Sequence, residues 1–119
     1  MATTNLSAES FERTVTSNDI VFVDFWASWC GPCRMFAPVY EKASAVHPDI
    51  VFGKVDTEAE QGLAAAARIT SIPTLMVFKG GTLVFSQPGA LPAAALEQII
   101  AAVRDLDVDA ARTEQKRSA

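Results

Sequence analysis

The chain has 119 residues, half of them apolar, which suits one domain with a hydrophobic core and no need for disulfide cross-links. A net charge of −4 without any basic block argues against nucleic acid as the main partner. No apolar stretch approaches the ~20 residues that span a bilayer, and the start of the chain lacks the pattern of a signal peptide, so we expect a cytoplasmic protein without membrane association.

The first half of the chain predicts strands that alternate with helices. Ser7 is a suitable N-cap for the first helix, and Pro38 should kink the second. The middle strand is apolar on both faces, which is typical of a strand buried inside a sheet. We expect the strands at residues 3–6, 20–26 and 50–56, and the helices at 8–15 and 31–47.

The second half predicts a short helix, a hairpin and a final helix. Thr57 and Glu60 match a capping box that would start the short helix. The pair Gly80–Gly81 is a hairpin turn signal, and Pro92 suits the first turn of the last helix. The expected elements are a helix at 57–68, strands at 74–78 and 83–86, and a helix with an apolar stripe at Leu96, Ile99, Ile100 and Val103.

This order of elements predicts an α/β fold. Parallel crossovers in the first part and an antiparallel hairpin in the second give a central mixed β-sheet flanked by helices on both faces. We expect a single domain over residues 1–106. Residues 107–119 are polar and charged, and are predicted to form a disordered tail.

Cys30 and Cys33 are the only cysteines, and they stand three positions apart where an expected strand leads into an expected helix. Residues at this spacing are neighbours on a helix, so the two sulfurs can approach disulfide distance, and the layout predicts dithiol–disulfide chemistry. Cys30 is the expected nucleophile, because a helix N-terminus stabilises a thiolate, and Cys33 is the expected resolving cysteine. Pro32 is tolerated in the first turn, and Gly31 lets another backbone come close.

Two other interpretations of the cysteine pair stay open. A tetrahedral zinc site needs four ligands, and two thiols and one histidine supply only three, so such a site would have to be shared across a dimer. A structural disulfide is a second alternative, although a loop this short constrains the unfolded chain little. Redox chemistry is favoured, and no metal is expected.

The segment VDFWASWCGPCRM, residues 23–35, closely resembles the active site of the thioredoxin family. Shorter matches lie at Pro38, 54–56, 72–74, 78–79 and 89–90. The resemblance covers about residues 5–106 and implies a thioredoxin fold and a monomeric protein-disulfide reductase that contributes to redox homeostasis. It further implies recharging by a thioredoxin reductase, with NADPH as the indirect electron source and no cofactor bound by this chain. Implied substrates are disulfides of peroxiredoxins, methionine sulfoxide reductases and ribonucleotide reductase.

The resemblance also assigns roles around the cysteines. Asp24 lies within an expected buried strand, where burial raises the pKa of a carboxyl group, and it matches the family's proton acceptor beneath the resolving cysteine. Lys54 matches a position that tunes this aspartate. The alternatives are an aspartate that is hydrogen-bonded for structure alone and a lysine that reaches solvent from the sheet.

Five further residues match the family's docking surface. Trp29 matches an exposed tryptophan, and Ile72 and Pro73 match the segment with the cis-proline, whose backbone can pair with an extended substrate. Gly89 and Ala90 match a loop of the substrate groove. A proline at the start of an edge strand and an ordinary turn are the respective alternatives. Trp26 is expected to pack in the core.

Two rival functions share this fold. An isomerase- or oxidase-like relative would have a more oxidising cysteine pair, against which the Gly–Pro dipeptide argues. A binding module would use the groove as a scaffold, with redox activity incidental. The reduction potential of the cysteine pair distinguishes a reductase from the isomerase- or oxidase-like relative. A variant without both cysteines distinguishes it from the binding module, which would keep its function.

Overall fold

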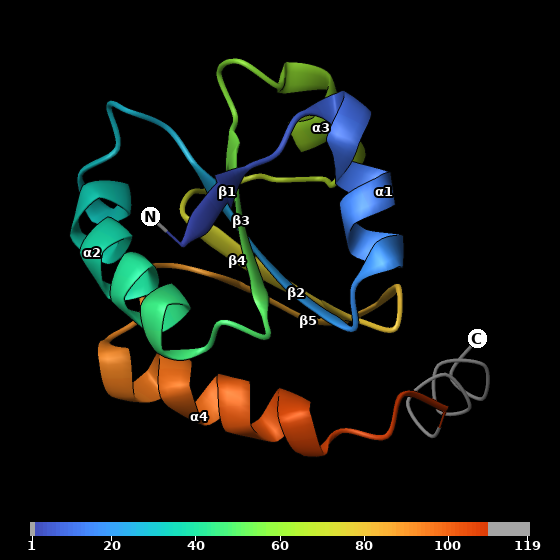
Figure 1. The fold of residues 1–119 in the computed structure, drawn as a ribbon. Helices are drawn as coiled ribbons and strands as arrows, with labels where there is room; N and C mark the ends of the chain where they lie inside the picture. The colour runs from blue at the N-terminus through green and yellow to red at the C-terminus, as the bar shows by residue number, and fades with distance from the viewer. Residues whose placement is uncertain (1, 110–119) are drawn as a thin grey trace.

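A computed structural model describes residues 2–109, which form a five-stranded mixed sheet between two layers of helices (Figure 1). The strands are β1 (Thr3–Asn5), β2 (Ile20–Trp26), β3 (Val51–Asp56), β4 (Thr74–Lys79) and β5 (Thr82–Pro88). The helices are α1 (Ala8–Ser17), α2 (Gly31–Val46), α3 (Gln61–Ala66) and α4 (Ala93–Asp105). The predicted α/β fold with a mixed sheet is confirmed.

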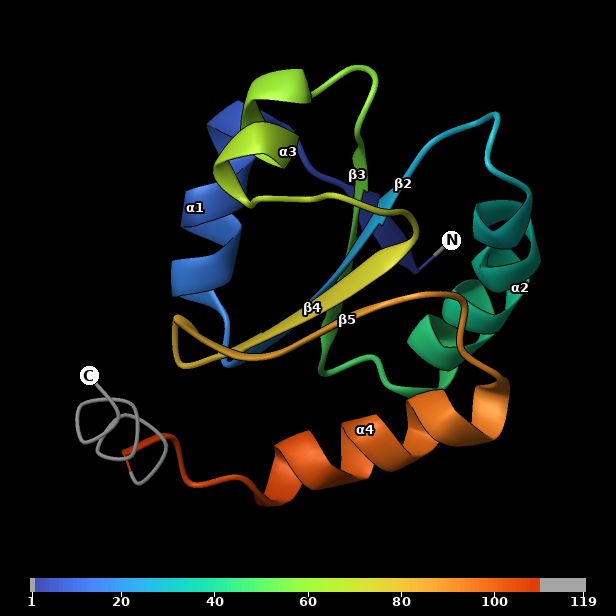
Figure 2. The same cartoon turned by 180° about the vertical axis from the view of Figure 1, so that it is seen from behind.

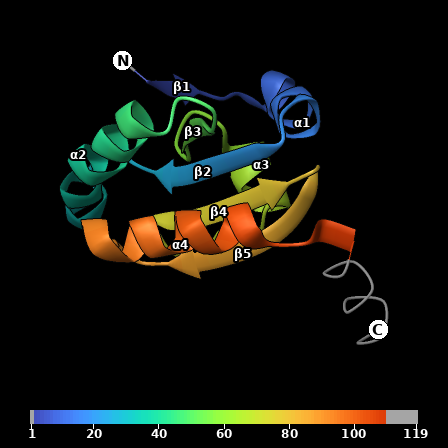
Figure 3. The same ribbon diagram turned by 60° about the horizontal axis from the view of Figure 1, so that its bottom comes forward.

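The strand order is β1-β3-β2-β4-β5, and it can be followed across the sheet in Figure 3. β1 and β2 both pair with β3 in parallel, whereas β4 is antiparallel to β2 and β5 is antiparallel to β4. Helices α2 and α4 cover one face, and α1 and α3 cover the other (Figures 1 and 2). The central strand β2 is therefore enclosed on both sides.

Alternation along β2 decides which layer each side chain enters. Phe22 packs in the cluster that α2 and α4 cover, while Val21 and Val23 pack in the cluster beneath α1 and α3. Successive side chains of a strand point to opposite faces, so Asp24 shares the α2 face with Phe22. The β2–β3 register sets Asp24 directly beside Lys54. The fold thus carries one carboxylate into the layer beneath the start of α2.

Several predicted boundaries differ from those observed. The helix predicted over 57–68 is the shorter α3, and the predicted capping box is wrong: Glu60 is the N-cap and makes no side-chain cap bond. Thr57 Oγ1 instead donates to the Trp26 carbonyl oxygen at 3.0 Å, which ties this loop to the end of β2. Pro92 is the N-cap of α4 and not part of its first turn. Ser7 caps α1 as predicted.

Two further expectations concern membrane association and the C-terminal tail. Within residues 2–109, no helix is long and apolar enough to cross a membrane. Of the predicted tail over 107–119, the structure describes only the first three residues, where Val108 and Asp109 have helical backbone. Residues 110–119 lie outside the described residues, so the domain boundary at residue 106 stays a prediction.

Candidate redox site

The two cysteines lie at the junction of β2 and α2, and they are joined as a disulfide with 5.2 Å between their Cα atoms. Cys30 is the N-cap of α2, and its backbone N–H is held by the Ala27 carbonyl oxygen at 3.2 Å. Both cysteines are buried together with Ala27. The strand therefore delivers the pair to the N-terminus of a sixteen-residue helix, as the sequence predicted.

The surroundings of the two sulfurs are not equivalent. The Cys33 backbone N–H donates to Cys30 Sγ at 3.2 Å, in the manner of a helix N-cap. This amide and the positive end of the helix dipole both stabilise a negative charge on Cys30 Sγ. Cys33 lies one turn inside the helix. The geometry therefore favours Cys30 as the sulfur that carries charge.

Three chain segments converge on Cys30. Its Sγ lies 3.7 Å from the carbonyl oxygen of Ile72, and the Ile72–Pro73 peptide bond is cis. The Gly89 N–H donates to the Pro73 carbonyl oxygen at 2.7 Å, and Gly89 has a positive φ of 103°, which glycine adopts without strain. Ala90, next along the chain, is exposed. The structure thus links three of the predicted docking positions, Ile72, Pro73 and Gly89, to the surroundings of Cys30.

Gly31 and Pro32 form the outer side of the same site. Pro32 is exposed, and a Cβ atom added at Gly31 would meet no atom within 4 Å. This open space borders the cysteine pair. A partner backbone can therefore approach the helix start closely.

Trp29 is the large apolar side chain at the rim, and 65% of it is exposed. Its indole Nε1–H donates to the carboxylate of Glu58, a residue for which the sequence predicted no role at the site. Glu58 is held in turn, because its backbone N–H donates to Asp56 Oδ1 at 2.9 Å. The sequence distance of 29 residues gives no local signal for this contact. The pairing of Trp26 with Asp56 across β2 and β3 brings the two loops together, with the bonds from Thr57 to the Trp26 carbonyl oxygen.

Asp24 is the one buried carboxylate of the site, with 1% of its surface exposed. Burial raises the pKa of Asp24 to about 7, and the nearby charge of Lys54 acts in the opposite direction. Within the described chain, neither carboxylate oxygen has a hydrogen-bond partner. Both Asp24 and Cys33 line a small cavity of about 90 Å³, which is large enough for water. The carboxylate can therefore exchange a proton near neutral pH.

Lys54 borders this cavity from β3. Its side chain is half-buried, and its ammonium group lies 5.0 Å from the centre of the Trp26 ring, within range of a cation–π contact. Trp26, which was expected in the core, is only half-buried and packs against the cysteine cluster. Lys54 is thus fixed next to Asp24.

The described residues contain no group of three or more His, Cys, Asp or Glu side chains that could hold a metal ion. His47, the one histidine, lies at the far end of α2. There its Nε2 contacts Glu97 Oε1 at 2.8 Å. These two residues link α2 to α4, away from the cysteines.

Comparison with known proteins agrees with this geometry. A family model described as thioredoxin matches residues 2–102. The chain is 57% identical over 111 residues to "Putative thioredoxin 2" of Streptomyces coelicolor, covering 93% of this chain and 83% of that protein. It is similar to a solved thioredoxin of Plasmodium falciparum, with a TM-score of 0.76 and 39% identity over 82% of this chain and 95% of that one. A chain solved in work on thiol resolution in yeast mitochondrial 1-Cys peroxiredoxin via glutathione and thioredoxin systems gives a TM-score of 0.77 and 32% identity, covering 88% and 96%.

Proposed function

The chain belongs to the thioredoxin family and is a thiol-disulfide oxidoreductase that reduces protein disulfides, and from that premise we propose how its residues divide the reaction. Cys30, as a thiolate, attacks one sulfur of a substrate disulfide. A bond forms between Cys30 Sγ and that sulfur, the substrate S–S bond breaks, and the other substrate sulfur leaves as a thiolate that takes up a proton. The hydrogen bond from the Cys33 amide to Cys30 Sγ supports this assignment.

In the second step Cys33 attacks the Cys30 sulfur of the mixed disulfide. The Cys30–Cys33 bond forms, the bond to the substrate breaks, and the second substrate thiol is released. Two electrons have then passed from the protein to its substrate. Asp24 receives the proton that Cys33 must lose, because its pKa of about 7 matches the working pH and both residues line one cavity.

Lys54 tunes this proton acceptor. Its charge lowers the pKa of Asp24 against the larger effect of burial. Without it, the carboxyl group would hold its proton to higher pH and accept the Cys33 proton less readily. The pairing of the two residues across β2 and β3 supports this role.

The substrate docks over the rim of the site. Trp29, Gly31 and Pro32 supply one side, and the loops at Ile72–Pro73 and Gly89–Ala90 supply the other. An extended segment beside the substrate disulfide lies along the Ile72 backbone, as in strand addition. The exposed tryptophan and the convergence of the loops on Cys30 support this surface.

Thioredoxins bind no cofactor themselves and carry their electrons on the cysteine pair. The oxidised chain is recharged by a thioredoxin reductase that draws on NADPH. Its substrates include peroxiredoxins, in keeping with the work in which a related chain was solved, together with methionine sulfoxide reductases and ribonucleotide reductase. It works as a monomer in the cytoplasm, where thiols are kept reduced.

The observation that carries this function is the Cys30–Cys33 disulfide at the N-terminus of α2. Its test is the reduction potential of the pair, measured by equilibration in dithiothreitol buffers. The reduction potential is about −270 mV for thioredoxin and about −180 mV for protein disulfide isomerase, and we expect the thioredoxin value. A potential near the isomerase value would instead indicate that the protein mainly oxidises or isomerises disulfides.

A further inference from the structure

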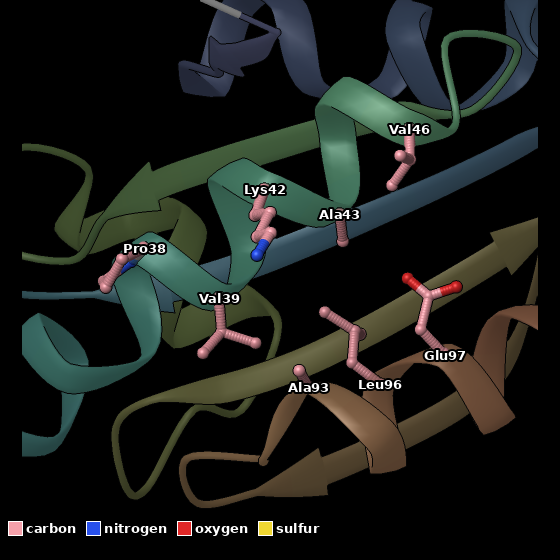
Figure 4. Close-up of a pocket in the computed structure, with 8 residues that line it drawn as sticks. All are labelled: Pro38, Val39, Lys42, Ala43, Val46, Ala93, Leu96 and Glu97. Carbon is pink, nitrogen blue, oxygen red and sulfur yellow. The ribbon is translucent and has the colours of Figure 1, made fainter.

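A second apolar surface begins where the redox site ends. Helices α2 and α4 enclose a groove of about 440 Å³. Figure 4 shows its side chains lying between the two helices, with Val39, Ala43 and Val46 from α2 and Ala93 and Leu96 from α4. Val46 is 66% exposed, although it is apolar. Exposed apolar surface of this kind marks sites of interaction.

The groove continues the surface around Cys30. Gly31, Met35 and Val39 follow one another at four-residue spacing, so they share one side of α2. Met35 is 74% exposed and bridges the helix start and the groove. On the other side, the loop that contains Gly89 leads within four residues to Ala93 at the start of α4. One apolar path therefore runs from the disulfide to the groove.

A protein substrate is large enough to contact the groove while its disulfide lies at Cys30. A substrate must bring its disulfide sulfur against Cys30, so its surface covers the surroundings of that residue. A standard interface of about 800 Å² per partner corresponds to a disc with a radius of roughly 16 Å. At 1.5 Å per helical residue, Val39 lies only about 13 Å from Cys30 along α2. A substrate docked on the redox site therefore covers the near end of the groove at Val39. A substrate segment that continues along the groove then meets Lys42 and Val46, about 18 and 24 Å from Cys30 along the helix.

Two charged residues flank the groove, and only one of them is engaged. Figure 4 shows Lys42 on the α2 side and Glu97 on the α4 side. Glu97 Oε1 contacts His47 Nε2 at 2.8 Å, whereas among residues 2–109 the Lys42 ammonium group has no ion pair or hydrogen bond. The groove therefore has an apolar floor with an unpaired ammonium group on its α2 side. Such a site complements an apolar segment that carries a carboxylate.

We propose that the groove between α2 and α4 is a second docking site for the protein whose disulfide Cys30 attacks, and that it holds an apolar segment with an acidic residue placed against Lys42. The inference rests on the proposed attack by Cys30. It assigns substrate selection to a surface that takes no part in the chemistry.

The test compares variants of exposed groove residues with matched variants on the opposite face. Val46→Gln and Lys42→Glu alter the groove, and Leu83→Gln and Arg13→Glu are their controls near α1 and β5. Pre-reduced proteins are mixed with insulin, with an oxidised peroxiredoxin, and with 2-hydroxyethyl disulfide. This small neutral disulfide is too short to reach the groove. Urea unfolding confirms that each variant is folded.

We expect each groove variant to reduce at least one protein disulfide roughly three- to tenfold more slowly, as loss of a buried apolar contact or of a charge pair predicts. Its rate with 2-hydroxyethyl disulfide and both control variants should stay at the wild-type level. Wild-type rates on both proteins would overturn the groove proposal alone. An equal loss on the small disulfide would overturn it too, because the substitution would then act on the redox centre. Insulin reduction that survives Cys30→Ser would refute the proposed attack itself.

Discussion

Replacement of Asp24 by asparagine tests the site through the stability of the protein. Burial raises the pKa of Asp24 from 3.8 to about 7. At 1.36 kcal/mol per pH unit, this rise of about 3 units amounts to roughly 4 kcal/mol. Because folded Asp24 holds a proton that the unfolded chain releases, the stability that this group contributes is fully present below pH 3.8 and is lost as the pH rises to about 7. An asparagine side chain cannot ionise, so the variant loses this dependence.

Urea unfolding of the oxidised wild type and of Asp24→Asn at several pH values measures the difference. We expect the variant to gain roughly 2 kcal/mol over the wild type at pH 5 and roughly 4 kcal/mol at pH 8, relative to the difference between them at acid pH. The gain should level off above pH 7. A difference between the two proteins that does not change with pH would refute a raised pKa at Asp24.

The same substitution should slow the second step of the reaction. In single-turnover experiments, acid quenching traps the mixed disulfide, whose decay reports the attack by Cys33. We expect this decay to slow roughly tenfold to a hundredfold at pH 7, as loss of a general base predicts, while formation of the mixed disulfide by Cys30 is unchanged. In the wild type the decay rate should rise through about pH 7. Equal decay rates in the two proteins would leave Asp24 without a role in proton transfer.

Substitutions at three further positions test contacts at the site and at the end of α4. Lys54→Met should raise the pKa of Asp24 further, since the lysine charge lowers it, and a carboxyl NMR titration whose midpoint stays at the wild-type value would contradict this. Glu58→Ala removes the acceptor of the Trp29 indole N–H, so KM for insulin should rise roughly threefold to tenfold at constant kcat; Glu58→Gln, which keeps an acceptor, should restore it, and an unchanged KM in the alanine variant would count against positioning. Lys79 Nζ donates to three carbonyl oxygens at the end of α4, at 2.7, 3.0 and 2.9 Å, so Lys79→Met should lower the free energy of unfolding by roughly 1–3 kcal/mol and speed amide exchange in α4. Unchanged exchange in α4 would show that these bonds do not hold the helix end.

Much of the fold follows from patterns that are local in the sequence. The continuous apolar run of β2 predicts a strand covered on both faces, and all of its residues except Trp26 are buried. Ser7 caps α1, and Gly80–Gly81 forms the turn between β4 and β5, because these residues act on their own backbone. The predicted start of the short helix was wrong because it depends on a contact that is not local. Thr57 is a residue type that often caps helices, yet its hydroxyl bonds to the end of β2, a contact that only the folded sheet supplies.

Features of the candidate site were likewise predictable where they are local in the sequence and not where they depend on distant contacts. The cysteine pair and its position at a helix start are local features, so the sequence predicts their placement. The neighbour of Trp29 is not local, because Glu58 reaches it from the loop after β3. The cis form of Ile72–Pro73 is indicated only by the family resemblance, since both isomers are compatible with the same residues. The groove between α2 and α4 depends on how two distant helices pack, which no single segment determines.

Asp24 is the position in this core that folding alone does not explain. Phe22 and Phe52 pack on the same face in apolar surroundings, and an apolar residue at position 24 would avoid a cost of roughly 4 kcal/mol at neutral pH. Structural aspartates in cores are hydrogen-bonded, but within the described chain both oxygens of Asp24 lack a partner. The carboxylate instead shares a cavity with Cys33 and lies beside Lys54. A carboxyl group whose pKa is raised to about 7 and that borders the resolving cysteine is placed to take up that cysteine's proton, which supports the proposed role of Asp24.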